Sequence, residues 1–308
     1  MTSQQGTDEV DERPAGARVT MAMVGSETPL VPIAWEQRDA MLYALGVGAG
    51  LGHPDSELQF TTENTGGVEL KSLPSFLTVL VVRAQPPALA TLDIGRLLHA
   101  EQRLELLQPL PPQGTGFVRN RVEAVADKGA GAGAIIHNAA TLYADAAGTM
   151  PLARSRSGIF VRSAGGFGGP RSSSAPYSLP TRAPDFRIAY DTRPEQALLY
   201  RLSGDRHRLH SDPAFARERG FPVPILHGLC TYGFACRALV NALAGGDSDR
   251  LTGMSARFSR PVLPGQTLTA EIWREADGNA VFRMLNPAGE TVLERGTASL
   301  RVPSNPTS

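Results

Sequence analysis

The sequence of 308 residues predicts an α+β fold in which one unit, a helix packed against an antiparallel sheet, occurs twice. Three observations predict it: matching motifs in the same order in both halves, a divider between the halves, and strands paired around turns. The matching pairs are 39–48 with 196–205, LPSF at 73–76 with LHGL at 226–229, and PLPPQGT at 109–115 with PVLPGQT at 261–267. An internal duplication is the simplest explanation, and two such units can join their sheets so that each covers an edge of the other.

The first half begins with an expected helix over residues 33–50, because Trp35, Met41 and Leu45 recur at helical spacing and glycines end the pattern. The apolar run 73–83 fits a buried helix or a buried strand by its length, and its counterpart in the second half favours a long helix. The expected strands are 97–108, two strands of a hairpin over 117–148 with a turn at Lys128-Gly129, and 154–164.

A divider, residues 164–184, is rich in Gly, Ser and Pro, a composition typical of a linker. In the second half the longest helix is expected over 226–246, where apolar side chains cover most of the surface and Gly245-Gly246 ends the run. The polar segments 1–18 and 304–308 are expected to be disordered tails.

Composition excludes several functional classes. The formal net charge is zero and the pI is near 7.0, and no basic stripe indicates a nucleic acid or an anionic membrane as a partner. No apolar run approaches the ~18 residues that a membrane span needs, and the polar N-terminus lacks the apolar segment of a signal peptide. We therefore expect a cytoplasmic protein.

The cysteines and lysines are few. Cys230 and Cys236 are the only cysteines and both fall in the expected long helix, so reduced thiols are expected rather than a disulfide framework. Basic residues are almost all Arg, with Lys only at Lys71 and Lys128, which weakly indicates a bacterial genome rich in G and C.

The turn that follows residue 203 carries the candidate chemistry. Asp205 and His210 lie between an apolar run and Asp212-Pro213, and that pair predicts a helix start because Asp caps free amides and Pro suits the first helical position. A carboxylate and an imidazole at one place can share a water molecule, one taking its proton while the other orients it. A solvated surface turn is the alternative, since isolated motif matches carry a high false-positive risk.

Gly228 lies in the first turn of the expected long helix. The first amides of a helix have no internal partner, the helix dipole there favours negative charge, and glycine lets a ligand approach closely. A thioester oxygen that becomes enolate-like would fit there, whereas a glycine needed only for packing clearance is the alternative. Six scattered histidines without a close cluster predict no metal site, and no organic cofactor is expected.

The motif YRLSGDRHRLHSDP at 200–213, followed by ILHGLCTYGFACR at 225–237, resembles the MaoC-like hydratase family. Within that family it is similar to the type 2, (3R)-specific enoyl-CoA hydratases that carry two hot-dog units. The resemblance extends from about Trp35 to Val302 through ALGVGAG, ELQFTTEN, LPSF, LLHAEQ, DKGAGAGAII, IFVRSAGGFGG and ARFSRPVLPGQT.

The resemblance implies a double hot-dog fold, each unit being a long helix wrapped by an antiparallel sheet. It implies an N-terminal hot-dog over 19–163 that forms a substrate wall, and a catalytic C-terminal hot-dog over 185–303. It also implies the reaction: hydration of trans-2-enoyl-CoA to 3-hydroxyacyl-CoA in fatty acid or steroid side-chain β-oxidation. Asp205 and His210 would activate the water, and the Gly228 amide would stabilise charge on the carbonyl oxygen. The implied partners are an acyl-CoA substrate and a second copy of the chain in a homodimer.

The resemblance also implies substrate contacts. His99 and Ala100 match the family's His-Gly, Lys128 matches a lysine suited to a CoA phosphate, and Phe258 matches a residue near the acyl–pantetheine path. Without the resemblance, these residues fit a core histidine with its strand neighbour, a solvated turn charge and ordinary strand core.

One departure from the family pattern lies in the turn itself, where His207 and Arg208 replace Asn and Pro. Loss of Pro is expected to loosen the turn, and Arg208 is expected to bring charge near the pocket. We hypothesise an unusual acyl group, such as a steroid side chain.

The first half lacks the acid of the pair. Gly48 aligns with Asp205, whereas His53 aligns with His210, so one active site per chain is expected and His53 is interpreted as a surface residue. Two other functions stay open: a non-catalytic acyl-CoA-binding subunit of the same family, and a hot-dog thioesterase, because one fold hosts several functions.

Overall fold

The computed structural model describes residues 18–171 and 176–301. The expected tails therefore lie outside the described residues, apart from Arg18, and so do residues 172–175 of the divider. No helix among the described residues has the length and apolar character needed to cross a membrane.

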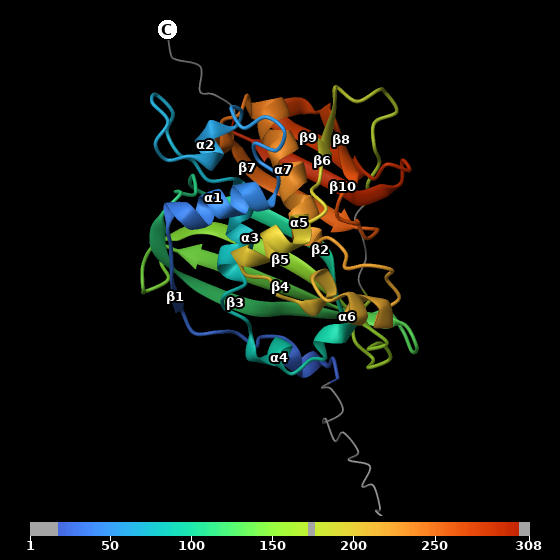
Figure 1. Cartoon of the computed structure of the whole chain (residues 1–308). Coiled ribbons are helices and arrows are strands. Elements are labelled where there is room, and N and C mark those ends of the chain that lie inside the picture. The colour runs from blue at the N-terminus through green and yellow to red at the C-terminus, as the bar shows by residue number, and fades with distance from the viewer. Residues whose placement is uncertain (1–17, 172–175, 302–308) are drawn as a thin grey trace, which may run out of the picture.

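Ten antiparallel strands form one continuous sheet (Figure 1). The strands are β1 (Val31–Trp35), β2 (Leu97–Leu106), β3 (Gly114–Asp127), β4 (Gly133–Tyr143), β5 (Pro151–Arg162), β6 (Phe186–Asp191), β7 (Leu251–Phe258), β8 (Thr267–Arg274), β9 (Asn279–Leu285) and β10 (Thr291–Leu300). Their order is β1-β3-β4-β5-β2-β7-β10-β9-β8-β6, so the second five repeat the first five in mirror order. The two halves join where β2 pairs with β7, and the double hot-dog fold is confirmed.

The helices are short except for one. They are α1 (Gln37–Gly46), α2 (Leu58–Thr61), α3 (Leu77–Val81), α4 (Pro87–Ala90), α5 (Gln196–Tyr200), α6 (Pro213–Glu218) and α7 (Gly228–Ala244). As predicted, α7 is the long helix of the second half, and Gly245 ends it in a left-handed conformation. Its side chains pack on the apolar inner face of β7–β10, which buries residues such as Met254, Ala270 and Phe282.

The prediction of a long helix over 73–83 is wrong in its length. A 3-10 turn (Pro74–Phe76) leads into α3, which ends at Val81. The run is rich in β-branched residues, which are weak helix formers, and Pro86 and Pro87 follow closely and cannot continue a helix. The strands of the first half, β1 to β5, are called the first sheet below, and those of the second half, β6 to β10, the second sheet. The first sheet therefore receives much less helical cover than the second.

The prediction of a helix over 33–50 is wrong at its start, where Ile33 and Trp35 lie in β1. Their side chains are buried while that of Ala34 is exposed, which is the alternation of a strand rather than the spacing of a helix. The helix itself begins after Glu36, whose side chain forms a capping box with Asp39. The strands predicted over 97–108, 117–148 and 154–164 are confirmed as β2 to β5.

The described part of the divider contains no helix or strand, and residues 164–171 of it are anchored to the first half. The amides of Gly166 and Gly168 donate to the two carboxylate oxygens of Asp127, each at 2.8 Å. Asp127 also accepts from the Gly129 amide at 2.8 Å, and these bonds hold its pKa below the usual value although partial burial opposes them. The divider thus packs on the turn between β3 and β4, beside Lys128.

Candidate active site

A cavity of about 1250 Å³ lies between elements of both halves. Its walls come from α3 and the inner face of β2–β5 on one side, and from residues 204–210, 225–231 and 257–262 on the other. All nine predicted site residues line it: Asp205, His210, Gly228, His99, Ala100, Lys128, His207, Arg208 and Phe258.

The turn that carries the candidate pair is held by its own backbone. Gly204 has a positive φ of 139° and ends the 3-10 turn Arg201–Ser203. Asp205 Oδ1 then accepts from the His207 amide at 3.1 Å. At the far end, Asp212 Oδ1 accepts from the amides of Ala214 and Phe215 at 3.0 and 3.1 Å, so the predicted helix start is confirmed.

His210 is oriented by one ring nitrogen. Its Nδ1 lies 2.8 Å from the carbonyl oxygen of Ile225, and because a carbonyl only accepts, Nδ1 carries the hydrogen. Nε2 is then the nitrogen with a free lone pair. Burial lowers the pKa of His210 below its usual value of about 6.5, although the Ile225 carbonyl and Asp205 act in the opposite direction. A neutral His210 can therefore accept a proton at Nε2 near neutral pH.

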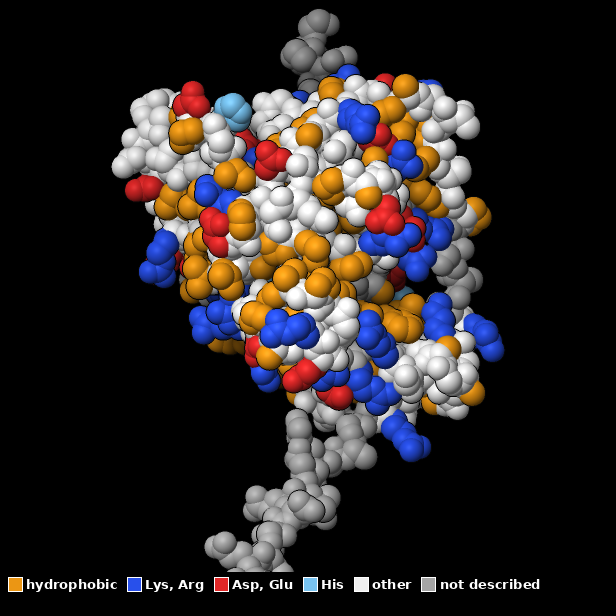
Figure 2. Space-filling model, turned by 45° about the vertical axis from the view of Figure 1, so that its right-hand side comes forward, with side chains coloured by type: hydrophobic (Ala, Val, Ile, Leu, Met, Phe, Trp, Pro, Cys, Tyr) orange, Lys and Arg blue, Asp and Glu red, His pale blue; other side chains and the backbone are white. Residues whose placement is uncertain are grey.

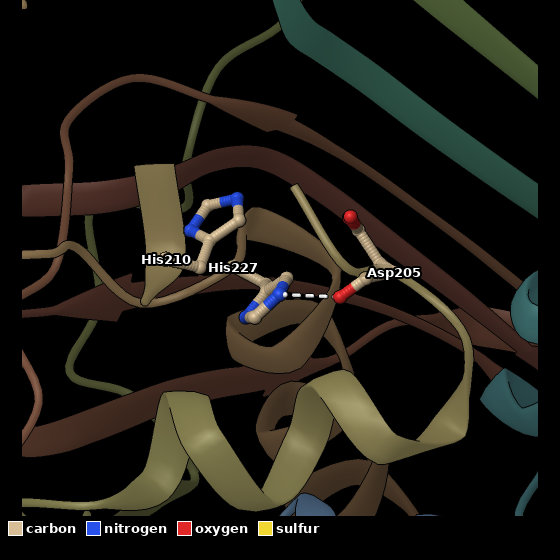
Figure 3. A group of neighbouring side chains, drawn as sticks. All are labelled: Asp205, His210 and His227. Atoms are coloured by element: carbon tan, nitrogen blue, oxygen red, sulfur yellow. Dashed lines mark hydrogen bonds between the residues drawn. The ribbon is translucent and has the colours of Figure 1, made fainter. Parts of the chain in front are cut away.

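His227 completes the group and was not predicted from the sequence. It is the residue before α7, and its Nε2 donates to the backbone carbonyl of Asp205 at 3.1 Å (Figure 3). Its ring stacks on that of His210, with centroids 3.7 Å apart. Burial, followed by the neighbouring His210, lowers the pKa of His227 to about 3, so this ring stays neutral. His227 thus ties the backbone of the turn to α7 and supports the His210 ring.

Asp205 lies next to both rings. A carboxylate oxygen of Asp205 and one nitrogen each of His210 and His227 all lie within 4.8 Å of one another (Figure 3). Burial opposes ionisation of the carboxyl, but His227, His210 and the His207 amide outweigh it and hold the pKa of Asp205 below its usual value. An ionised carboxylate and a neutral imidazole therefore face one cavity.

The same three side chains have the types that bind metal ions, but their geometry does not suit one ion. The rings of His210 and His227 are stacked, with only 25° between their planes. An imidazole binds a metal close to its own ring plane at about 2.0–2.1 Å, and two stacked planes do not meet at that distance. One ring would have to rotate out of the stack to share an ion with the other.

Gly228 is the first residue of α7, and a side chain there would crowd its neighbour. A Cβ there would lie 3.1 Å from the Phe258 ring. The first amides of this 17-residue helix lack intrahelical partners, and the helix dipole favours negative charge next to them. The cavity therefore offers an oxyanion site within the same wall as Asp205 and His210.

On the opposite wall, His99 is tied into the first sheet. Its Nε2 lies 3.1 Å from Gln102 Oε1 and its ring packs on Phe258, with centroids 4.9 Å apart. Burial lowers the pKa of His99, so the ring is neutral and donates to Gln102. His99 is therefore a hydrogen-bonded core histidine that also lines the cavity.

The two unusual residues of the turn are both constrained. Arg208 binds Asp212 Oδ2 and lies over the Phe215 ring at 4.9 Å. This ion pair restrains the turn at the position where the family pattern has Pro. His207 Nδ1 accepts from the Leu209 amide at 3.3 Å, so the hydrogen of its neutral ring lies on Nε2.

The mouth of the cavity is basic. Seven of its lining residues are cationic and two are acidic, Asp93 and Asp205. The cationic residues are Lys128, Arg162, Arg206, Arg208, Arg219, Arg257 and Arg260. Figure 2 shows Lys and Arg side chains gathered on the lower right of the molecular face. This charge suits an anionic group such as a phosphate.

Both halves match known family models. Residues 34–163 match the MFE-2 hydratase 2 N-terminal domain, and residues 177–294 match the MaoC like domain. The 3-hydroxyacyl-thioester dehydratase Y of Mycobacterium tuberculosis is 44% identical, over 84% of this chain and 89% of that protein. The enoyl-CoA hydratase ChsH3 of the same organism is 39% identical, over 82% and 88%.

Among solved structures, a MaoC-like dehydratase from Phytophthora capsici superposes with a TM-score of 0.81 at 32% identity, over 92% of this chain and 99% of that one. The double hot-dog fold and these relatives define the protein as an enzyme of the hydro-lyase class. The chain belongs to the MaoC-like hydratase family, in the branch with a hydratase 2 N-terminal domain.

Proposed function

We propose that the protein adds water to trans-2-enoyl-CoA and forms (3R)-3-hydroxyacyl-CoA, with Asp205 and His210 as the acid–base pair. One observation carries the assignment: an Asp205 carboxylate oxygen and a His210 nitrogen lie within 4.8 Å in the cavity that Gly228 also lines. Relatives named enoyl-CoA hydratase support the reaction.

In the proposed reaction the pair holds one water molecule. Its oxygen bonds to the β-carbon while one of its protons passes to the pair, and the electrons of the double bond move toward the thioester carbonyl. The Gly228 amide stabilises the resulting enolate-like oxygen. A proton from the pair then bonds to the α-carbon, so that water is added without a net change in the enzyme. The thioester itself acidifies the α-carbon, and no cofactor is invoked.

We assign the two halves different roles within boundaries 19–163 and 185–303. The second half supplies the acid–base pair and the oxyanion site, and the first half supplies the wall that binds substrate. His99, Ala100 and Phe258 would line the path of the acyl–pantetheine arm. Lys128 and the arginines of the cavity mouth would bind the phosphates of CoA, since charge-assisted bonds to phosphate are strong.

The acyl group is proposed to be bulky, with a steroid side-chain thioester as one such substrate. The cavity has a volume of about 1250 Å³, which the acyl chain shares with the pantetheine arm and the CoA phosphates. It extends under α3, where the short helix leaves the inner face of the first sheet uncovered. We also propose that the protein acts in the cytoplasm of a bacterium and forms a homodimer. Light scattering of the purified protein tests for the dimer.

The test is to mix purified protein with trans-2-enoyl-CoA and follow the enoyl absorbance and the free thiol together. Loss of absorbance without thiol release is the expected result. Thiol release would instead mean a thioesterase, and binding without either change would mean a non-catalytic acyl-CoA-binding subunit. A screen across short, long and steroidal enoyl-CoAs defines the acyl preference, and equal turnover of short linear and steroidal thioesters would contradict the bulky-substrate assignment.

A further inference from the structure

The inner face of the first sheet carries polar side chains where the second carries apolar ones. We name as the polar patch Gln102 of β2, Asn120 of β3, Asn138 of β4, and Ser155 and Ser157 of β5. All five line the large cavity. The corresponding face of β7–β10 presents residues such as Met254, Ala270, Phe282 and Met284 to α7. The fold alone therefore does not require polar residues here.

Sheet register gathers the polar patch into one surface. Ser157 pairs with Gln102 on one side and with Asn138 on the other, so these three side chains form a row across β2, β5 and β4. In the next row, Ser155 and Asn120 lie on either side of Ala140. Residues so placed share a face of the sheet and lie within reach of one ligand group.

The hydrogen bonds of the polar patch are incomplete. Gln102 is satisfied, because Oε1 accepts from His99 and Nε2 donates to Ser155 Oγ at 2.8 Å. Asn120 and Asn138, however, are only 2% and 6% exposed, and within the described residues neither side-chain oxygen has a hydrogen-bond partner. Buried polar atoms are normally paired with protein, ligand or ordered water, so these two oxygens are free to accept from a donor that occupies the cavity.

The polar patch begins beside His99 and extends across the sheet. Gln102 accepts a hydrogen bond from His99 at 3.1 Å, and Asn138 lies two strands further across the sheet at about 4.8 Å per strand. The enoyl thioester group carries no N–H or O–H, so it cannot supply the missing donor. A distant part of the acyl group, held under α3, can.

We propose that the polar patch recognises a hydroxyl group on the acyl chain, remote from the double bond. A hydroxyl donates to an amide oxygen of Asn138 or Asn120 and accepts from the Ser157 hydroxyl. This inference rests on the proposed function and narrows its substrate class to hydroxylated bulky acyl thioesters. A site built to bind a hydroxyl discriminates strongly against the analogue that lacks it, because its own polar groups then stay unpaired.

The experiment compares kcat/KM for pairs of long or ring-bearing trans-2-enoyl-CoAs, each with and without one remote hydroxyl at varied positions. Wild-type protein is expected to favour at least one hydroxylated partner by roughly 10-fold or more. Asn138→Leu should abolish that preference and leave turnover of a short linear enoyl-CoA unchanged. Ile135→Val, a change in an apolar residue of the same cavity, is the matched control and should retain the preference.

Thermal unfolding of ligand-free Asn138→Leu provides a second readout. Replacing an amide whose buried oxygen lacks a partner by an apolar group of similar size should raise Tm by roughly 2–4 °C. Should that variant fail to fold, Ser157→Ala takes its place and should reduce the preference. Equal turnover of hydroxylated and plain substrates at every position would overturn the inference but leave the hydration reaction intact. If no enoyl-CoA were turned over, the proposed function itself would be overturned.

Discussion

The two halves of the chain differ most where their sequences align at the candidate site. In the second half, Asp205 and His210 face an open cavity. In the first half, the aligned segment packs on α7, where Arg237 donates to the Val47 carbonyl at 2.8 Å and binds both carboxylate oxygens of Glu57. Gly48, aligned with Asp205, has a φ of 78°, and a Cβ there would lie 2.6 Å from the Phe234 ring.

The aligned positions therefore have opposite surroundings. His53, the counterpart of His210, is exposed and does not line the large cavity. A buried ion pair fills the space that a second site would need, since Arg237 is only 3% exposed. A carboxylate at position 48 would meet Phe234 and the already paired Arg237.

The helices of the two halves differ in the same complementary way. In the second half, 17-residue α7 fills the concave face of its sheet and begins with the candidate oxyanion site. In the first half, five-residue α3 leaves that face to the cavity. A duplicated unit has thus specialised: one copy supplies chemistry and a solid core, and the other supplies space.

Substitution of Asp205 or His210 should have the largest effect on kcat, whereas substitution of His53 should have none. Asp205→Asn and His210→Gln should each lower kcat by about 10²–10⁴-fold, because each removes one member of the acid–base pair. His53→Gln is the matched control and should retain wild-type kcat in the absorbance assay. A comparable loss in His53→Gln would refute the account of a single site.

The next effect tests the amide of Gly228. The Ala and Pro variants both add a Cβ that crowds Phe258, but only Pro removes the N–H. Proline suits the first helical position, and the extended backbone of His227 (φ −59°, ψ 136°) tolerates a following proline. Gly228→Pro should therefore lower kcat by a further ~10²–10³-fold relative to Gly228→Ala. Equal kcat values in the two variants would exclude the amide as the oxyanion donor.

The ion pair in the first half should govern stability rather than chemistry. Arg237→Met leaves Glu57 buried without its partner and should destabilise the fold by about 3–5 kcal/mol in denaturant titration. The double variant with Glu57→Leu should recover part of that loss. Both variants should retain kcat per folded molecule, and a selective loss of kcat would show that this segment contributes to catalysis.

The smallest effect is a pH dependence of stability. Burial lowers the pKa of His227 to about 3, and burial also lowers the pKa values of His99, His207 and His210. The unfolded chain then binds more protons than the folded one below about pH 6.5, so the free energy of unfolding should fall as pH falls from there toward 3. Tm measured between pH 7.5 and 4 should show this decline.

His227→Phe retains the stack on His210 and removes the largest of these contributions. The decline in Tm should therefore be shallower than in wild type. An identical slope in wild type and His227→Phe would refute the assigned burial of a neutral ring.

The sequence predicted the strands and helix ends that depend on residues close together in the chain. Turn signals such as Lys128-Gly129 located β2 to β5, and the Asp212-Pro213 pair located α6. His227 escaped prediction because its hydrogen bond reaches back 22 residues to the Asp205 carbonyl, which depends on how α7 meets the turn. The only available signal was its place beside Gly228, where the first half has Pro74.

Two other features also depend on tertiary structure. The end of α3 follows from β-branched residues and the prolines at 86 and 87, but the apolar run alone favoured a longer helix. The polar patch comes from four strands, and only their register brings Gln102, Ser157 and Asn138 into one row. Each residue alone resembles an ordinary polar strand position.

We propose that one acid–base pair in the second half adds both parts of water to the substrate. Hydration of trans-2-enoyl-CoA in ²H₂O, followed by NMR of the product, tests this most directly. One pair on one side of the substrate predicts that the hydroxyl and the new deuterium are added to the same face, and the proposed function adds that the hydroxyl is (3R). A (3S) product, or deuterium on the opposite face, would contradict the account.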